Sequence, residues 1–304
     1  MNKLIVILGP TASGKTRLAV QVAHRLGGEI ISADSRQVYR NMDIGTGKDL
    51  AEYQFGDETI PYHLINITDA GRDYNVYQYQ QDFYREVPEI LARGHTPIVC
   101  GGTGLYIEAV LKGHQFTAIP IDLDFREELS RKTDEELLLL FQQTASAYTA
   151  VADTSTRKRV IRAIEINRYL NGHKLTEIPA MPVLPEYEVF GIDLPVEVRR
   201  QRITRRLHER LQNGMIKEVE QLLACGVPAE KLVFYGLEYK FITHYLQGQL
   251  DYDTMVNRLE TAIHQFAKRQ MTFFRKMERD GIPIRWLNGL NTTDTLTEEI
   301  LTTI

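Results

Sequence analysis

The feature that most constrains the fold is a glycine-rich octapeptide that follows a short apolar run near the N-terminus. Residues 4–8 are all apolar, which is typical of a buried parallel strand, and residues 18–26 repeat apolar side chains at helical spacing. Between them, the pattern G-x-x-x-x-G-K-[ST] is formed by Gly9, Pro10, Thr11, Ala12, Ser13, Gly14, Lys15 and Thr16. A strand, this loop and a helix in succession predict a parallel α/β sheet.

The octapeptide also predicts a ligand. Backbone N–H groups of such a loop, together with the N-terminus of the following helix, form a cradle for anions. Lys15 adds a point charge, and the hydroxyl of Thr16 can hold Mg²⁺. We therefore expect two linked phosphates to bind here, with a glycine-rich turn of no function as the alternative.

The remaining pattern divides the chain into a core and an insertion. Further buried strands are expected just before Asp34, at 97–100 and at 187–194, with a late candidate at 283–287. Helices are expected at 80–93, 196–213, 215–225 and 252–279, whereas 116–185 shows only helical signals, including a capping box at 133–136. We predict an α/β fold with a P-loop NTPase-like parallel sheet core flanked by helices, residues 1–115 and 186–304, and a mostly helical insertion domain, residues 116–185.

Composition excludes several classes of protein. With 304 residues, 43% hydrophobic and 25% charged, the chain is neither disordered nor fibrous. Its apolar runs are far shorter than the roughly 20 residues of a membrane span, and its N-terminus does not resemble a signal peptide. Cys100 and Cys225 stand far apart outside any metal-binding pattern, which favours a reducing compartment. We expect a cytoplasmic protein without a membrane partner, and a monomer, because no long apolar stripe demands a second chain.

The net charge of −4 argues at first against a nucleic-acid partner. However, residues 1–153 carry 14 Lys and Arg against 21 Asp and Glu, whereas residues 154–304 carry 22 against 19. Residues 157–217 alone carry 13 against 7. A mildly acidic protein can bind RNA through such a basic part, and binding is then sensitive to salt.

A polar cluster follows the second predicted strand. Residues 34–40 supply one carboxylate, one amide, two guanidiniums and an aromatic ring, which suits a nucleobase and its phosphates. Asp34 could alternatively hold Mg²⁺, as a carboxylate at the end of a buried strand does in P-loop NTPases. An ordinary polar loop is the third interpretation.

Together with four other segments, the phosphate loop and this cluster resemble the tRNA dimethylallyltransferases, also called tRNA isopentenyltransferases. The blocks are residues 9–16, 34–40, 42–46, 101–106, 159–165 and 267–272, in family order and over nearly the whole chain. The resemblance implies that the loop holds dimethylallyl diphosphate, with Mg²⁺ as cofactor. The dimethylallyl group would pass to N6 of the adenosine just 3′ of the anticodon in tRNA, releasing diphosphate.

The resemblance also implies roles for single residues. Asp34 matches the family's general base and Thr103 a residue near the reacting adenine, while Lys15, Thr16 and Arg206 match groups that neutralise the departing diphosphate. The residues that match tRNA-contacting positions, expected to bind the anticodon stem-loop, are Asp34, Ser35, Arg36, Gln37, Thr103, Arg126, Lys158, Arg159, Val160, Ile161, Arg162, Tyr239 and Lys240. Gln37 could read the edge of the adenine, which must flip out of the loop to be reached.

Simpler interpretations remain for several of these positions. Arg206 could be a solvated charge on an arginine-rich helix, the basic helix from Lys158 a solvated face, and the glycines before Thr103 a mere connection. Three rival functions also remain: a P-loop small-molecule kinase, an adenylate (AMP or ATP) prenyltransferase, and an RNA-binding module without catalysis. A kinase explains neither the 34–40 cluster nor the basic insertion. An RNA-binding module without catalysis would not need Lys15 and Asp34, and both are present.

The chain departs from the family pattern at several positions. Lys158 stands at a usual glutamine, His264 at a usual arginine and Glu238 at a usual glycine, and 273–274 is a Phe pair where tryptophan is common. Gly47 and Asp49 replace the usual alanine and proline. None of these departures falls in the phosphate loop or at Asp34, Thr103 or Arg206, so we expect the reaction to be kept, while the departures leave the details of tRNA recognition open.

Overall fold

The computed structural model describes residues 3–304 and divides the chain into two compact units. One unit contains the residues up to Leu111 together with Leu184–Ile304, and the other contains Lys112–Val183. The boundaries expected from the sequence, 115 and 185, lie within a few residues of these limits.

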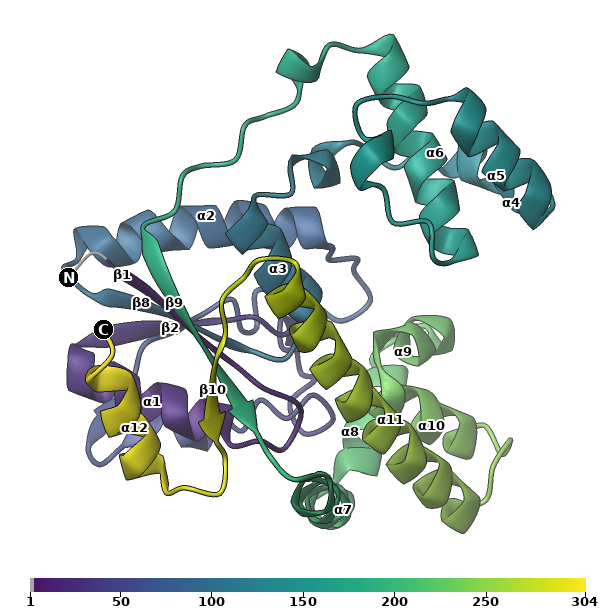
Figure 1. Cartoon of the computed structure of the whole chain (residues 1–304). Helices are drawn as coiled ribbons and strands as arrows, with labels where there is room; N and C mark the ends of the chain where they lie inside the picture. Colours follow the sequence, from purple (N-terminus) through teal and green to yellow (C-terminus); the bar gives the residue numbers. More distant parts are fainter. Residues whose placement is uncertain (1–2) are drawn as a thin grey trace. The chain divides into compact units, whose positions relative to one another are not determined.

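A parallel sheet with the strand order β10-β9-β1-β8-β2-β6 forms the centre of the first unit (Figure 1). Its strands are β1 (Lys3–Leu8), β2 (Gly28–Ser32), β6 (Tyr62–His63), β8 (Thr96–Gly101), β9 (Glu186–Asp193) and β10 (Arg285–Asn288). Residues 4–8 are buried on both faces of the sheet, as their continuous apolar run indicates. The predicted parallel α/β core is thereby confirmed.

Helices cover both faces of this sheet (Figure 1). On one face, α1 (Lys15–Leu26) and α12 (Thr293–Leu301) pack on side chains such as Ile5, Ile7 and Phe190. On the other face lie α2 (Val76–Ala92) and α3 (Gly104–Lys112). Because both faces are covered, the strands carry apolar side chains in two directions rather than in alternation.

A further group of helices packs beside the carboxyl ends of the strands (Figure 1). These are α7 (Val196–Gln212), α8 (Met215–Ala224), α9 (Ala229–Tyr235), α10 (Leu237–Leu246) and the long α11 (Tyr252–Arg279). They share a second core with Val38, Tyr39 and Met42, which follow β2. The segment after β2 is therefore fixed against helices that come some 200 positions later in the chain.

Short elements complete the first unit between β2 and α2. The ladder of β3 (Tyr39–Arg40) with β7 (Thr68–Asp69) is parallel, and β4 (Gln54–Phe55) pairs with β5 (Glu58–Thr59) in a hairpin. A 3-10 helix, η1 (Leu50–Tyr53), precedes the hairpin. Within residues 3–304, no helix has the length and apolar character needed to span a membrane.

The second unit is a small helical bundle. It contains α4 (Leu123–Ser130), α5 (Asp134–Gln143) and α6 (Arg157–Gly172), with 3-10 turns η2 (Gln115–Ala118), η3 (Thr149–Val151) and η4 (Leu175–Glu177). The predicted capping box opens α5, with the Thr133 side chain and the Glu136 side chain each bonded to the other's backbone N–H. Leu129, Leu137 and Ile164 lie at its core.

Candidate functional site

The phosphate loop connects β1 to α1 at the carboxyl end of a central strand. Ala12 and Gly14 have positive φ values of 59° and 88°, a backbone conformation that lets successive N–H groups form a concave anion site. The Oγ of Ser13 is buried without a hydrogen-bond partner among residues 3–304. The loop thus offers a buried hydroxyl that the described part of the chain does not itself satisfy.

Lys15 and Cys100 lie together under this loop. Burial lowers the pKa of Lys15, and the nearby Cys100 and Asp34 raise it in part. Burial raises the pKa of the Cys100 thiol to about 12, against the effect of the Lys15 ammonium. The thiol therefore stays protonated and is no candidate nucleophile, whereas the cation next to it gains by meeting an anion.

Asp34 and Thr103 come together because they follow neighbouring strands, β2 and β8. The Thr103 Oγ1 accepts a hydrogen bond from the backbone N–H of Ser35 at 3.0 Å, and the Thr103 N–H donates to the carbonyl of Ala33 at 3.0 Å. Asp34 Oδ1 accepts from the N–H of Arg36 at 2.9 Å, which uses one of its two carboxylate oxygens. The two predicted residues are thus held at one place by backbone bonds.

Two residues make this approach of segments possible. A Cβ at Gly101 would lie 2.2 Å from the carbonyl oxygen of Ala33, so only glycine fits there. From α11, the Gln270 amide accepts from the N–H of Thr11 and donates to the carbonyl of Gly102, both at 2.9 Å. One side chain therefore joins the phosphate loop to the turn before Thr103.

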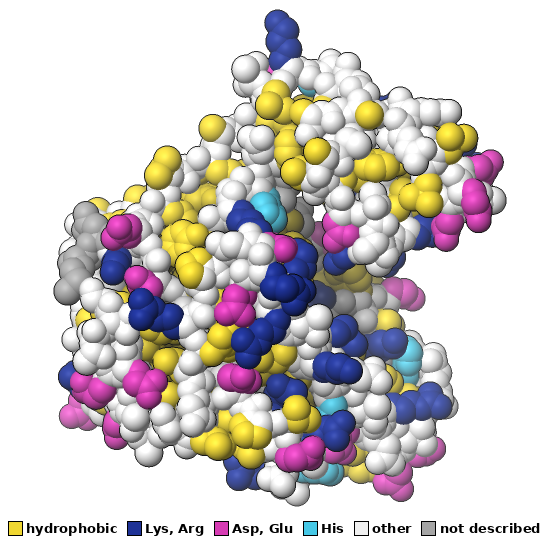
Figure 2. Space-filling view, in the orientation of Figure 1, with side chains coloured by type: hydrophobic (Ala, Val, Ile, Leu, Met, Phe, Trp, Pro, Cys, Tyr) yellow, Lys and Arg dark blue, Asp and Glu magenta, His cyan; other side chains and the backbone are white. Residues whose placement is uncertain are grey.

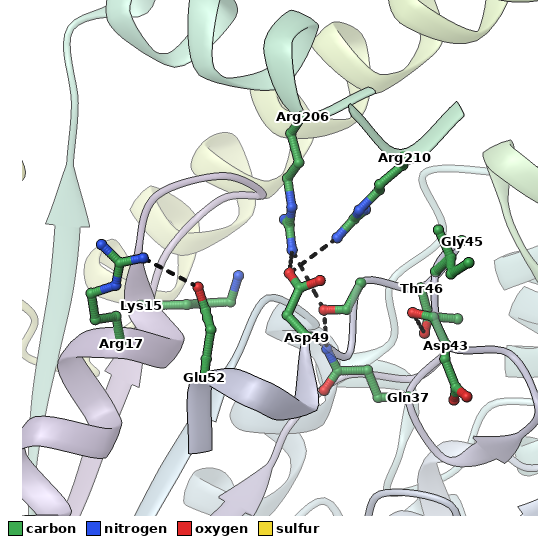
Figure 3. A network of polar contacts seen from close by, with 12 residues as sticks. Lys15, Arg17, Gln37, Asp43, Gly45, Thr46, Asp49, Glu52, Arg206 and Arg210 are labelled. Carbon is green, nitrogen blue, oxygen red and sulfur yellow. Dashed lines mark hydrogen bonds and ion pairs between the residues drawn. The ribbon is translucent and has the colours of Figure 1, made fainter. Parts of the chain in front are cut away.

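Arg206 and its neighbour Arg210 point from α7 toward Asp49 (Figure 3). Asp49 Oδ2 pairs with the Arg206 guanidinium and lies 3.3 Å from Nη2 of Arg210. Burial opposes ionisation of Asp49, but the two guanidiniums outweigh it and lower its pKa. One of the departures from the family pattern, Asp49, thus forms an ion pair with Arg206.

A buried carboxylate fixes the loop before Asp49. Glu218 of α8 accepts hydrogen bonds from the backbone N–H groups of residues 43, 44 and 45, at 2.7, 2.7 and 3.0 Å. The hydroxyl of Tyr239 donates to the same carboxylate at 2.7 Å, and Tyr239 is only 1% exposed. The Tyr239 side chain is thus buried at the lining of the cavity, whereas Lys240 is half-buried.

The polar side chains after Asp34 already have partners. Gln37 Oε1 accepts from the hydroxyl of Ser32 at 3.0 Å, and its Nε2 donates to the carbonyl of Gly47 at 3.2 Å. The Arg36 guanidinium donates to the carbonyl of Phe234 at 3.3 Å and lies 5.5 Å from the centre of its ring. These bonds fix the orientation of the Gln37 amide and use one of its two N–H donors and one of its two acceptor lone pairs, which leaves one of each for a base edge.

One cavity of about 1130 Å³ in the first unit gathers these groups. Its lining includes the phosphate loop from Thr11, together with Asp34, Thr103, Arg206, Arg210, Glu238 and Lys240. Lys and Arg side chains gather on the surface over α11 and its neighbours (Figure 2). The lining thus combines an anion cradle, basic groups and the carboxylate of Asp34 at the end of β2.

The predicted tRNA-binding residues of the helical unit divide into two groups. Arg126 donates to both oxygens of the buried Glu165, at 3.0 and 2.8 Å, and Arg162 pairs with the same carboxylate. Val160 lies in the core of the unit and the half-buried Ile161 packs against it, so their side chains hold the bundle together. Lys158 and Arg159 are exposed, and Arg159 lies 2.7 Å from Asp153 Oδ2.

Sequence reasoning missed three residues that build the site. Gln270 lay within a family block, and its place in an apolar helix face was the only signal of its buried role. Glu218 and Arg210 gave no signal, because their partners stand 173 and 161 positions away. Partners that stand so far apart leave no local sequence pattern from which their contact could be predicted.

Comparison with known proteins identifies the same family that the sequence motifs resemble. A model described as "IPP transferase" matches residues 37–277, and one described as "Isopentenyl transferase" matches residues 2–60. The chain is 54% identical to tRNA dimethylallyltransferase 1 of Porphyromonas gingivalis, over 98% of both chains. It is 50% identical to tRNA dimethylallyltransferase 1 of Parabacteroides distasonis, over 99% of this chain and 96% of the relative.

A solved structure resembles the whole chain. It is the full-length tRNA isopentenylpyrophosphate transferase from Bacillus halodurans, with a TM-score of 0.71 and 32% sequence identity. The match covers 100% of this chain and 95% of that protein.

Proposed function

This chain belongs to the IPP transferase family of tRNA dimethylallyltransferases, and we propose that it prenylates N6 of the adenosine just 3′ of the anticodon. It is a prenyl-transferring enzyme with a P-loop-like fold, and tRNA is its partner. The observation that carries the residue assignments is the single cavity shared by the phosphate loop, Arg206 and Asp34. Such a cavity can hold a diphosphate at one side and a carboxylate beside the acceptor amine at the other.

The leaving group sets the first demand on the site. When the bond between C1 of the dimethylallyl group and the bridging oxygen breaks, its electron pair stays on the diphosphate. Lys15, the loop N–H groups and Arg206 offset that growing charge. Because burial lowers the pKa of Lys15, an arriving diphosphate restores a favourable partner for the ammonium.

The acceptor sets the second demand. The N6 lone pair of adenine is delocalised into the ring, so the amine attacks well only if it loses a proton as the new bond to C1 forms. The second oxygen of Asp34 can take that proton, while Thr103 holds the neighbouring backbone in place. The proton then resides on Asp34 Oδ2 until it passes to solvent.

Mg²⁺ is the proposed cofactor, and the residues present fit it. No group of three or more Asp, Glu, His or Cys suited to a metal occurs within residues 3–304, so the chain offers no all-protein cage. Mg²⁺ commonly binds through one or two protein oxygens together with substrate phosphates. Thr16, at the start of α1, would supply the protein oxygen, and the ion would add positive charge at the diphosphate.

The decisive experiment is incubation of the enzyme with dimethylallyl diphosphate, Mg²⁺ and unmodified tRNA, followed by mass analysis of nucleosides. N6-dimethylallyladenosine is the expected product. Parallel reactions with AMP and ATP should give no product. A prenylated nucleotide in these reactions would indicate an adenylate prenyltransferase instead. Phosphoryl transfer from ATP would instead support a kinase and contradict the proposal.

Arg206 gives a second test. Arg206→Ala should raise the Michaelis constant for dimethylallyl diphosphate and slow turnover, because one charge is removed from the diphosphate side. Loss of a hydrogen bond between charged partners corresponds to about tenfold or more in kcat/KM. Unchanged kinetics would exclude the role.

We also propose that the enzyme acts as a monomer in the cytoplasm, on the anticodon stem-loop. The absence of a spanning helix within residues 3–304 and the tRNA-modifying relatives are compatible with this setting. Sedimentation of the purified protein alone, and with a synthetic stem-loop, would measure both the mass and the minimal RNA. A dimer would contradict the proposed monomer. Failure to bind the stem-loop would contradict the proposed RNA substrate.

A further inference from the structure

Two positions where the chain departs from its family's pattern, 47 and 49, meet at the guanidinium of Arg210, and a third, Glu238, lines the same cavity. Gly47 has a φ of 66°, and a Cβ there would lie 1.8 Å from Nη2 of Arg210. Asp49 lies 3.3 Å from the same atom, and Glu238 acts on Arg210 electrostatically. The alanine usual at position 47 would push the Arg210 guanidinium out of its place, so Gly47 makes room for it.

The charges around Asp49 do not balance. A single carboxylate oxygen serves both Arg206 and Arg210. The Arg210 side chain is only 13% exposed, and burial, together with the neighbouring Arg206, lowers its pKa. Burial raises the pKa of Glu238, so for this carboxyl too it favours the neutral form. Two guanidiniums thus share one carboxylate oxygen, with the carbonyl of Gly47 as a further acceptor for Arg206, and a more highly charged anion would satisfy them better.

The two arginines face the same space as the phosphate loop. Arg206, Arg210, Lys15 and Asp49 all line the one cavity, and Arg206 is close enough to lower the pKa of Lys15. Lys15 points from the start of α1 toward the region where the arginines of α7 meet Asp49 (Figure 3). A diphosphate in the loop can therefore extend its oxygens toward both guanidiniums. Its several oxygens can accept hydrogen bonds in pairs, which a single shared oxygen cannot.

We propose that Arg210 is a second diphosphate-binding arginine beside Arg206, and that Asp49 holds both guanidiniums until the diphosphate replaces its carboxylate. This inference rests on the proposed function, because it concerns the diphosphate of the same substrate. Asp49 suits a temporary partner, since its side chain is 39% exposed and can turn to solvent when displaced. When the diphosphate product leaves, the carboxylate returns to the arginines.

The first test titrates inorganic diphosphate, with Mg²⁺, into the full chain by calorimetry. Arg210→Ala should weaken binding about tenfold, the value expected for one charge-assisted contact. Arg200→Ala is the matched control, because Arg200 is an exposed arginine of α7 outside the cavity lining, and it should change binding less than about twofold. Equal affinities of the two variants would overturn the assignment. Arg210→Lys, which keeps the charge, should restore part of the affinity.

The second test separates a temporary partner from a structural one. Asp49→Asn removes the competing charge and should tighten diphosphate binding severalfold. If Asp49 instead only positioned the arginines, the same variant would bind diphosphate more weakly, and that result, or unchanged binding, would overturn the displacement. Gly47→Ala should weaken binding in wild type and should weaken it less in an Arg210→Ala background, because the methyl group, which would lie 1.8 Å from Nη2 of Arg210 and 2.7 Å from Nη2 of Arg206, then meets only Arg206. Equal losses in both backgrounds would contradict the role of Gly47.

Turnover distinguishes this inference from the proposed function. The wild type is first assayed with dimethylallyl diphosphate and tRNA. If it neither turns over nor binds diphosphate, both proposals fail. If it does both, while Arg210→Ala leaves diphosphate affinity and the Michaelis constant for dimethylallyl diphosphate unchanged, only the present inference fails. Thermal unfolding of each variant shows whether a loss reflects binding or folding.

Discussion

The cavity of the first unit and the core of the helical unit both bring two arginines to one carboxylate, yet they do so differently. In the cavity, the half-exposed Asp49 shares one oxygen between Arg206 and Arg210. In the helical unit, Glu165 is 3% exposed and binds Arg126 through both of its oxygens. The first arrangement can be exchanged for a ligand, whereas the second is a permanent part of the fold.

The difference concerns how firmly a carboxylate holds each arginine. A guanidinium held by two oxygens of a buried carboxylate would leave that carboxylate unpaired if it moved to RNA, at a large cost. Arg162 adds hydrogen bonds to the carbonyls of Phe116, Pro120 and Ile119, which anchor it further. Positive charge in a sequence therefore does not by itself indicate an RNA contact, because the depth and geometry of the partner decide it.

The largest effect is expected where the cavity performs its chemistry. Asp34→Ala should lower the rate of prenyl transfer by about 10³-fold, since the amine loses its proton acceptor, and should leave tRNA binding nearly intact. Single-turnover rates and filter binding of tRNA measure the two quantities separately. Normal turnover would show that Asp34 is not the base, and equal loss of binding and rate would show that it acts in recognition.

A third carboxylate sharpens the contrast between exchangeable and permanent pairs. Glu29, at the start of β2, binds Arg93 at 2.9 and 2.7 Å and contacts His63 and His95. Arg93 lowers the pKa of Glu29 to about 2, against the opposing effect of burial. Glu29 should therefore stabilise the fold above about pH 4.5, by about 3 kcal/mol, and this stability should disappear as the pH falls toward 2.

Denaturant unfolding of wild type and Glu29→Gln between pH 6 and 3 would measure this contribution. The difference between the two proteins should be largest at the upper end of the series and should shrink with acid. Asp57→Asn, at an exposed position, provides the control for a lost surface carboxylate. A difference that grew with acid would contradict the assignment.

The permanent pair of the helical unit predicts a loss of stability. Glu165→Gln keeps the size of the side chain but removes the charge that Arg126 and Arg162 share, and should destabilise the fold by about 2 kcal/mol. Urea unfolding would measure the effect, with Glu177→Gln at an exposed position as control. If stability were unchanged and tRNA affinity altered, the two arginines would belong to the RNA surface after all.

The smallest effect is expected from single exposed charges of α6. Lys158→Ala should weaken tRNA binding by less than about 1 kcal/mol and lower the salt dependence by about one counterion, because an exposed lysine contributes mainly to phosphate contacts. Lys174→Ala, exposed in the same unit, is the comparison. Binding measured over a series of salt concentrations would show whether the slope changes only for Lys158.

The sequence allowed the sheet to be predicted because its signals are local. The apolar runs of β1, β8 and β9 stand between glycine turns and amphipathic helices, so the strands and their parallel pairing followed from simple rules, whereas the strand order did not. The edge strand β6 was missed, since two residues are too few for any pattern. The same holds for β3 and β7, which exist only as partners of each other.

The site was predictable where topology alone brings residues together. Asp34 and Thr103 end neighbouring strands, and neighbouring parallel strands place their carboxyl ends at one edge. Burial of Tyr239 and Val160 could not be foreseen, because it depends on which distant helix covers them. Both positions match the family pattern, and both side chains pack in cores of the protein.

Gln270 has a consequence for how this protein is made. Its amide bonds the N–H of Thr11 and the carbonyl of Gly102, positions that precede it by 259 and 168 residues. During synthesis the phosphate loop leaves the ribosome early, while the side chain that fixes it arrives only when most of the chain has been translated. A nascent chain that stops before α11 thus carries the complete loop sequence without the support that holds it in place.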